Sequence, residues 1–159
     1  MVTDSSEWVF LLHRLPREPS APRIALWRAI RRLGALLLAD GLVALPASAR
    51  TIEHVEWLAA GIEEQGGVAS VWVARPTAGA TTRLLAEQGR ASVEDEYRGV
   101  MREVEANAEL SEVERRRLVR RLRAELRRIG SRDYFHAPGA SAARDRVEQL
   151  AMAMAETTA

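Results

Sequence analysis

The stretch from Ala35 to Pro46 restricts the fold more than any other part of the chain. It consists of two short apolar runs joined by Asp40-Gly41. Asp-Gly is a dipeptide that accepts the positive φ angles of a tight turn between antiparallel strands. Pro46 ends the second run, because proline lacks the N–H that a paired strand needs. The stretch therefore predicts a β-hairpin.

Two further strands and two helices are expected around this hairpin. Residues 8–12 read WVFLL, a continuous apolar run that predicts a strand, and residues 68–74 read VASVWVA, with Trp72 in its middle, and predict another. A helix is expected from about Ser20, as its N-cap, to Leu33, with Gly34 ending it. A second helix is expected from Ser48 to Gly66-Gly67.

The resulting order over residues 7–75 is strand, helix, strand, strand, helix, strand. This is the ferredoxin-like βαββαβ arrangement, in which a four-stranded antiparallel sheet packs against two helices. The tryptophans Trp8, Trp27, Trp57 and Trp72 fall one to each predicted strand or helix, at positions expected to face the core. The fold class is therefore α+β.

The remaining part, residues 80–156, predicts an all-helical C-terminal extension. A short helix is expected at 80–88 with Gly89 breaking it, and a last helix is expected over about 141–152. Between them lies an acidic helix at about 92–108. Its apolar stripe consists of Val93, Tyr97, Val100, Met101, Val104 and Ala108.

An Arg-rich helix is expected over about 111–129, opening with Ser111-Glu-Val-Glu114, which matches a capping box. One arc is apolar and contains Leu118, Val119, Leu122, Leu126 and Ile129, with Arg115 as the one arginine inside it. The opposite arc contains Arg116, Arg117, Arg120, Arg121, Arg123, Arg127 and Arg128. Guanidinium groups bind phosphate bidentately, so these seven are the candidates for contact with nucleic acid.

Charge is segregated along the chain, although the net charge is only +1. All 23 basic residues are arginine and none is lysine, a bias that the base composition of a high-GC genome explains. Residues 91–109 carry 2 Arg and 6 acidic residues, whereas 110–132 carry 9 Arg and 3 acidic residues. Two interpretations therefore stay open: the basic face is exposed to solvent or ligand, or the neighbouring acidic helix neutralises it.

The residue pattern does not favour an enzyme. The chain has no cysteine, no Gly-rich phosphate loop after the first strand and no GxSxG motif. Its histidines, His13, His54 and His136, have no second ligand at metal spacing. Asp133, three residues before His136, is expected to shape the local turn rather than form an acid–base pair. We expect no catalytic residue, no metal and no cofactor.

A second group of arginines surrounds the first helix. Arg23 lies in its first turn, where unpaired amides and the helix dipole favour an anion. Arg14, Arg23, Arg28 and His136 are the candidates for binding an oxyanion such as chromate, sulfate or phosphate. The alternative is ordinary ion pairing at the surface.

The N-terminus is acidic and leads into a short apolar run, so it does not resemble a signal peptide. The longest apolar stretch is interrupted at Asp40-Gly41 and is too short to span a bilayer. A soluble, cytoplasmic protein without membrane contact is expected.

Three segments resemble the N-terminal domain of the ChrB chromate-resistance regulators. They are the opening strand Trp8–Leu12, the run from Ser20 through the hairpin to Leu45-Pro46, and Asp133-Tyr-Phe-His-Ala-Pro-Gly139. The resemblance spans about residues 7–150. It includes Arg23, Trp27, Arg28, Gly34, Asp40, Gly41, Asp133, Phe135, Pro138 and Gly139. The first segment is also similar to the central domain of phenylacetate-operon repressors, which share the ferredoxin-like build of CRISPR adaptation nucleases.

This resemblance implies a chromate-responsive transcriptional regulator of efflux operons, with DNA as partner, an oxyanion as effector and a homodimer as the expected assembly. Two departures limit it: the C-terminal domain of many family members and the winged helix of the phenylacetate repressors are expected to be absent. A nuclease is disfavoured, because Leu12-His13-Arg14 stands where those enzymes have a metal-binding Asp. An interaction module without DNA binding is the alternative, and an oxyanion-processing enzyme is a third hypothesis.

Overall fold

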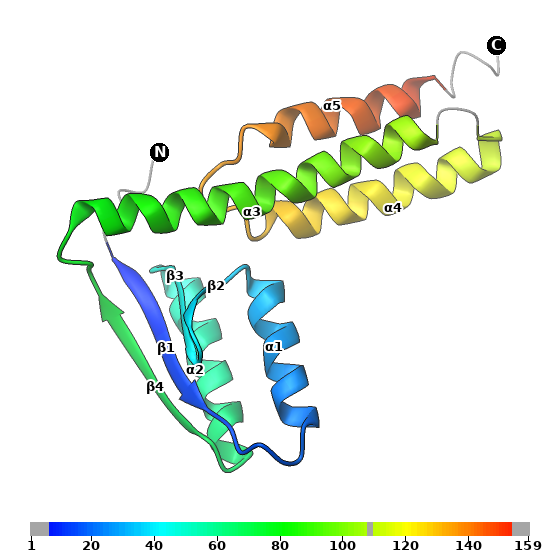
Figure 1. Ribbon diagram of the computed structural model, residues 1–159. Coiled ribbons are helices and arrows are strands. Elements are labelled where there is room, and N and C mark those ends of the chain that lie inside the picture. The colour runs from blue at the N-terminus through cyan, green and yellow to red at the C-terminus, as the bar shows by residue number, and fades with distance from the viewer. Residues whose placement is uncertain (1–6, 108–109, 154–159) are drawn as a thin grey trace. The chain divides into compact units, whose positions relative to one another are not determined.

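A computed structural model describes residues 7–107 and 110–153 (Figure 1). The chain divides into two compact units, the first ending at Glu87 and the second beginning at Gln88. The first unit holds a four-stranded sheet and two helices, and the second is helical. The combination of a four-stranded antiparallel sheet with helices is as predicted.

The sheet of the first unit is antiparallel throughout, with strand order β2-β3-β1-β4. Its strands are β1 (Trp8–Arg14), β2 (Leu36–Ala39), β3 (Leu42–Pro46) and β4 (Val68–Ala74). Helices α1 (Ala21–Leu33) and α2 (Ala49–Glu64) follow β1 and β3 along the chain. Helix α2 packs on β1 and β4 and beside α1. Val9 and Leu11 of β1 are fully buried in this core.

The hairpin between β2 and β3 is confirmed, but only one of its turn residues needs a special conformation. Gly41 has a φ of 75°, whereas Asp40 has a negative φ. The Gly41 carbonyl accepts a 2.7 Å hydrogen bond from the His13 N–H, and a Cβ at position 41 would lie 2.4 Å from the His13 oxygen. Glycine is therefore required both by the turn and by its close approach to β1.

The three predicted helix caps lie at the expected residues, but one of them lacks the expected side-chain hydrogen bond. Gly34 ends α1 with a φ of 72°. Ser48 and Thr51 form a reciprocal capping box at α2, since each side chain accepts a hydrogen bond from the other residue's N–H, at 3.1 and 2.9 Å. Ser20 is the N-cap of α1, as predicted, but the expected capping hydrogen bond was wrong, because the Ser20 backbone is already helical and its side chain makes no such bond.

The second unit is built on three helices: α3 (Gly79–Ala106), which begins within the first unit, α4 (Glu112–Gly130) and α5 (Gly139–Met152). The predicted break at Gly89 was wrong, because α3 is continuous there. A Cβ at Gly89 would lie 2.5 Å from the Phe135 ring, so this glycine makes room for an aromatic side chain instead of ending the helix. The other helix bounds lie within a few residues of those predicted, and Ala108 of the predicted stripe lies outside the described residues.

The core of the second unit lies where the apolar stripes of the three helices meet. The five apolar residues of the predicted arc of α4 are all buried, and Val93, Tyr97 and Val100 of α3 pack against them. Ala143 and Val147 of α5 complete the cluster. Helical periodicity therefore identified the inward faces correctly.

Three of the four tryptophans are exposed, which corrects the prediction that all face the core. Trp8 is 1% exposed, but Trp27, Trp57 and Trp72 are 55%, 73% and 62% exposed. Trp57 lies two residues after buried Val55, about 200° around α2, and so points away from the sheet. Trp72 lies on β4, an edge strand.

Candidate functional site

The arginine face of α4 is open in the second unit. Helix α4 begins at the predicted capping box, with Glu114 accepting hydrogen bonds from the Ser111 N–H at 3.1 Å and from its hydroxyl. These bonds lower the pKa of Glu114. Because α3 and α5 pack on the apolar arc, all seven predicted nucleic-acid contacts are exposed. The acidic helix does not cover the face.

The seven arginines form two rows along the helix. Residues spaced by three and four positions share one side of a helix. Arg116, Arg120, Arg123 and Arg127 form the row beside α5, which we call the groove row. Arg117, Arg121 and Arg128 form the row beside α3. The structure therefore brings the predicted residues together as two parallel stripes of positive charge.

A groove of about 500 Å³ lies along the groove row. Its lining consists of the four groove-row arginines together with Val119 of α4 and Ala151 of α5. Small apolar side chains between long cationic ones leave the guanidinium groups accessible from solvent. This arrangement suits an anionic ligand that lies along the helix.

Carboxylates neutralise the groove row only in part. Arg116 pairs with Glu112, and Arg123 pairs with Glu148 of α5 through its Nε and Nη2, with an Nε–Oε1 distance of 2.9 Å. The hydrogen bond from Arg123 lowers the pKa of Glu148, and Glu148 raises the pKa of Arg123. Within the described residues, Arg120 and Arg127 have no ion-pair partner. The row therefore sets four positive charges against two carboxylates.

The row beside α3 has one ion pair among the described residues. Arg121 donates two hydrogen bonds to Glu103 of α3, and this carboxylate raises the pKa of the guanidinium. Arg117 and Arg128 have no such partner in the described part of the chain. The acidic helix thus meets the basic helix at one edge of the arginine face, through an exposed pair that contributes at most about 1 kcal/mol.

Such a face can bind phosphate in the bidentate manner of guanidinium. The existing pairs are exposed, so a phosphate group can replace a carboxylate partner at little free-energy cost. Within the ranges 7–107 and 110–153, no cluster of His, Asp or Glu could hold a metal ion, and no helix is long and apolar enough to cross a membrane.

The predicted oxyanion ligands are distributed over both units. Arg14 ends β1, and Arg23 and Arg28 lie on α1, whereas His136 belongs to the second unit. All four side chains are exposed. Arg23 and Arg28 are five positions apart, so α1 presents them about 140° from each other. Their role as oxyanion ligands stays a prediction.

Sequence reasoning missed a set of contacts that hold the loop from Ser131 to Pro138 against α3. The Asp133 carboxylate accepts hydrogen bonds from the Ala137 N–H at 3.0 and 3.1 Å and from the Tyr97 hydroxyl at 3.4 Å. Burial, followed by the charge of Asp133, raises the pKa of Tyr97. Asp133 therefore shapes the turn, as expected, with Tyr97 as a partner from a distant part of the chain.

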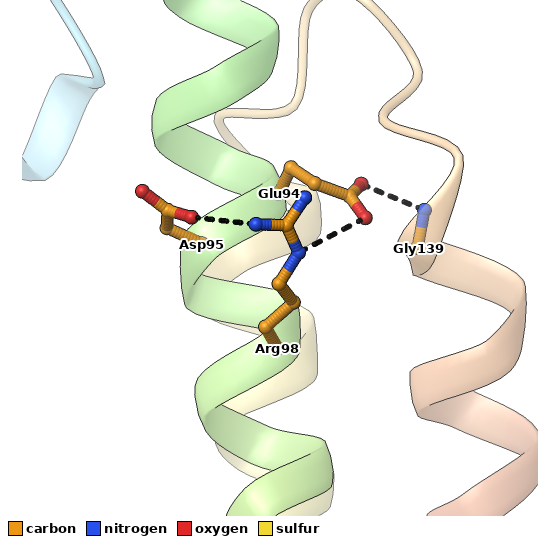
Figure 2. Close-up of polar contacts among 4 residues, drawn as sticks. All are labelled: Glu94, Asp95, Arg98 and Gly139. Atoms are coloured by element: carbon orange, nitrogen blue, oxygen red, sulfur yellow. Dashed lines mark hydrogen bonds and ion pairs between the residues drawn. The ribbon is translucent and has the colours of Figure 1, made fainter.

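Glu94 makes the matching contact at the start of α5. Its carboxylate accepts a 2.8 Å hydrogen bond from the Gly139 N–H, and Arg98 lies beside it with an Nε–Oε1 distance of 3.9 Å (Figure 2). A Cβ at Gly139 would lie 2.6 Å from Glu94 Oε1, so a larger residue there would displace the Glu94 carboxylate from its present position. Glu94 places a negative charge where helix α5 exposes its first amides, which is favourable. The two glycines, Gly89 and Gly139, were the sequence signals for this packing.

A family model described as "Protein ChrB, N-terminal" matches residues 23–159. The match covers 137 of the 159 residues. It contains α4, its arginine face, and the loop from Ser131 to Pro138. No curated protein and no solved structure matches the chain.

Proposed function

The chain belongs to the family of ChrB N-terminal domains and is thereby associated with chromate resistance, and from this premise we propose that it is a non-enzymatic regulator that contacts DNA through the arginine face of α4. Chromate or a related oxyanion is the effector in this proposal. The observation that carries it is the exposure of all seven arginines on one side of a helix.

The charge pattern matches a phosphate backbone better than base edges. A row of guanidinium groups neutralises successive phosphates and releases counterions, which gives affinity that depends strongly on salt and weakly on sequence. The groove row adds a concave track with two arginines, Arg120 and Arg127, that no described carboxylate engages. These two side chains are the first expected phosphate contacts.

Unit 1 is proposed to be a ferredoxin-like domain. The strand order β2-β3-β1-β4 and the helices after β1 and β3 agree with that arrangement. Its arginines Arg14, Arg23 and Arg28 are the proposed oxyanion ligands of this unit, with His136 as a candidate in the other. Cytoplasmic residence stays a prediction.

The test is a band-shift titration with DNA from upstream of the chain's own gene, in low salt, with and without chromate. We expect wild-type protein to shift the DNA and chromate to change its affinity. The variant R120A/R127A should bind DNA more weakly. The variant R23A/R28A, which loses the same charge, should bind DNA normally and respond less to chromate. Absence of any shift in low salt would exclude the DNA contact.

A second candidate function is binding of an acidic protein segment. It is favoured by the observation that Arg116, Arg121 and Arg123 already hold carboxylates. A protein that fails to shift DNA but is retained on immobilised polyglutamate, with retention lost in R120A/R127A, would support this function instead.

A further inference from the structure

The two edges of the sheet in the first unit differ in how they are protected. Natural sheets blunt an exposed edge with charged residues, proline, a bulge or a short strand. Strand β2, at one edge, has only four residues, and its pairing with β3 is irregular between Leu37 and Ala39. This edge is therefore protected against pairing with another strand.

Strand β4, at the other edge, has none of these protections. Its seven residues, VASVWVA, include no charged residue and no proline. All seven pair with β1 in one uninterrupted register, from Trp8–Ala74 to Arg14–Val68, so the strand has no bulge. Val68, Trp72 and Val73 are 64%, 62% and 50% exposed. In the described chain no strand lies on its outer side.

We propose that β4 pairs antiparallel with β4 of a second copy of this chain, joining two four-stranded sheets into one. A two-fold axis pairs a strand with itself, and opposed residues must then point to the same face of the sheet. The register centred on Val71 pairs all seven residues. Val68 then opposes Ala74, Ala69 opposes Val73, and Ser70 opposes Trp72.

This register leaves no unfavourable neighbour. No pair within the strand brings like charges together, and the first cation beyond it, Arg75, would oppose Gly67. The edge by itself would also accept a different strand. A second copy of β4 is favoured because, running antiparallel, it pairs with all seven residues and brings neither two charges nor a proline into the pairing. The inference concerns unit 1 and does not rest on the proposed DNA contact of α4.

The register can be tested by charge placement at Ser70 and Trp72, which share the face that Phe10 occupies on β1. In the proposed dimer, S70K/W72K places like charges opposite each other twice, whereas S70K/W72E places opposite charges there twice. Both variants remove the same two side chains and the 3.0 Å hydrogen bond between Trp72 Nε1 and Ser70 Oγ. They therefore control for each other in folding.

The measurement is sedimentation equilibrium of the full chain at micromolar concentration, with far-UV circular dichroism to verify the fold. We expect twice the monomer mass of 17.6 kDa for wild type and S70K/W72E, and the monomer mass for S70K/W72K. A monomeric wild type, a dimeric S70K/W72K, or two monomeric variants would each overturn the proposal. The third result would do so because it contradicts the register.

Discussion

The ring of Phe135 lies against Gly89 of helix α3, so closely that a Cβ at position 89 would be 2.5 Å from Cε2 and 2.8 Å from Cδ2. The two residues are 46 positions apart in the sequence, but each accounts for the presence of the other at this contact. The glycine lets the ring approach the helix backbone, and the ring belongs to the loop that leads into α5. The contact accounts for a glycine in the middle of a 28-residue helix.

The variant G89A should lose about 1–3 kcal/mol of the free energy of unfolding, because the added methyl group overpacks the site. This loss runs against helix propensity, which favours alanine over glycine by roughly 0.5–1 kcal/mol. The matched control is G99A in the same helix, where the nearest atom to a Cβ is Arg102 Nη2 at 3.9 Å. G99A should raise stability in urea denaturation. Equal gains in both variants would contradict the proposed packing.

The variant E94A should lose about 1–2 kcal/mol, because it removes the carboxylate that accepts the Gly139 N–H at the start of α5. The Glu94 side chain is only 17% exposed, so water replaces the bond poorly. D95A removes a neighbouring carboxylate that pairs with Arg98 at the surface, and should change stability by less than about 0.5 kcal/mol. Urea denaturation of both variants measures the difference, and equal losses would exclude a specific role for Glu94.

The pair Arg123–Glu148 should make a stability contribution that depends on pH. The pKa of Glu148 is lowered from 4.5 in the folded chain. A carboxyl group whose pKa is lower in the folded chain than in the unfolded chain stabilises the fold at pH values above its unfolded-state pKa. This contribution is lost as the pH falls through the folded-state pKa. In R123A, carboxyl NMR titration should return the Glu148 pKa toward 4.5. R120A, in the same row but without a carboxylate partner, should leave it unchanged. An equal change of the Glu148 pKa in both variants would show that the arginine row as a whole lowers it, rather than the pair with Arg123.

The salt dependence of DNA binding should reflect the groove row. Each lost phosphate contact reduces the slope of log K against log salt concentration by about 1, so R120A/R127A should reduce it by about 2. R23A/R28A should keep the wild-type slope, because α1 is not the proposed contact. Fluorescence anisotropy at several salt concentrations provides both values. An unchanged slope in R120A/R127A would place the contact elsewhere.

Local signals predicted most of the fold. The strands, the hairpin at Gly41, the end of α1 at Gly34 and the buried arc of α4 all followed from periodicity and turn chemistry over a few residues. These features depend on backbone conformation and on which side of an element is apolar, and neighbouring residues encode both. The predicted break at Gly89 failed for the complementary reason. Glycine permits both a helix end and a close approach, and only Phe135, distant in sequence, decides between them.

The sequence by itself therefore determined the strands, most of the helices, and that seven arginines share one side of α4. Only the tertiary structure decided that this side is open. Periodicity identifies an apolar face but not what packs around it. From the sequence alone, the acidic helix could equally have covered the arginines of α4 or packed on the opposite, apolar face of that helix. The buried cluster formed by Tyr97, Leu122 and Val147 resolves this, because burying apolar surface contributes far more than exposed ion pairs. The same limit explains exposed Trp72, because the sequence of β4 does not show that the strand lies at an edge of the sheet. Trp57 differs, because helical periodicity alone places it about 200° from buried Val55.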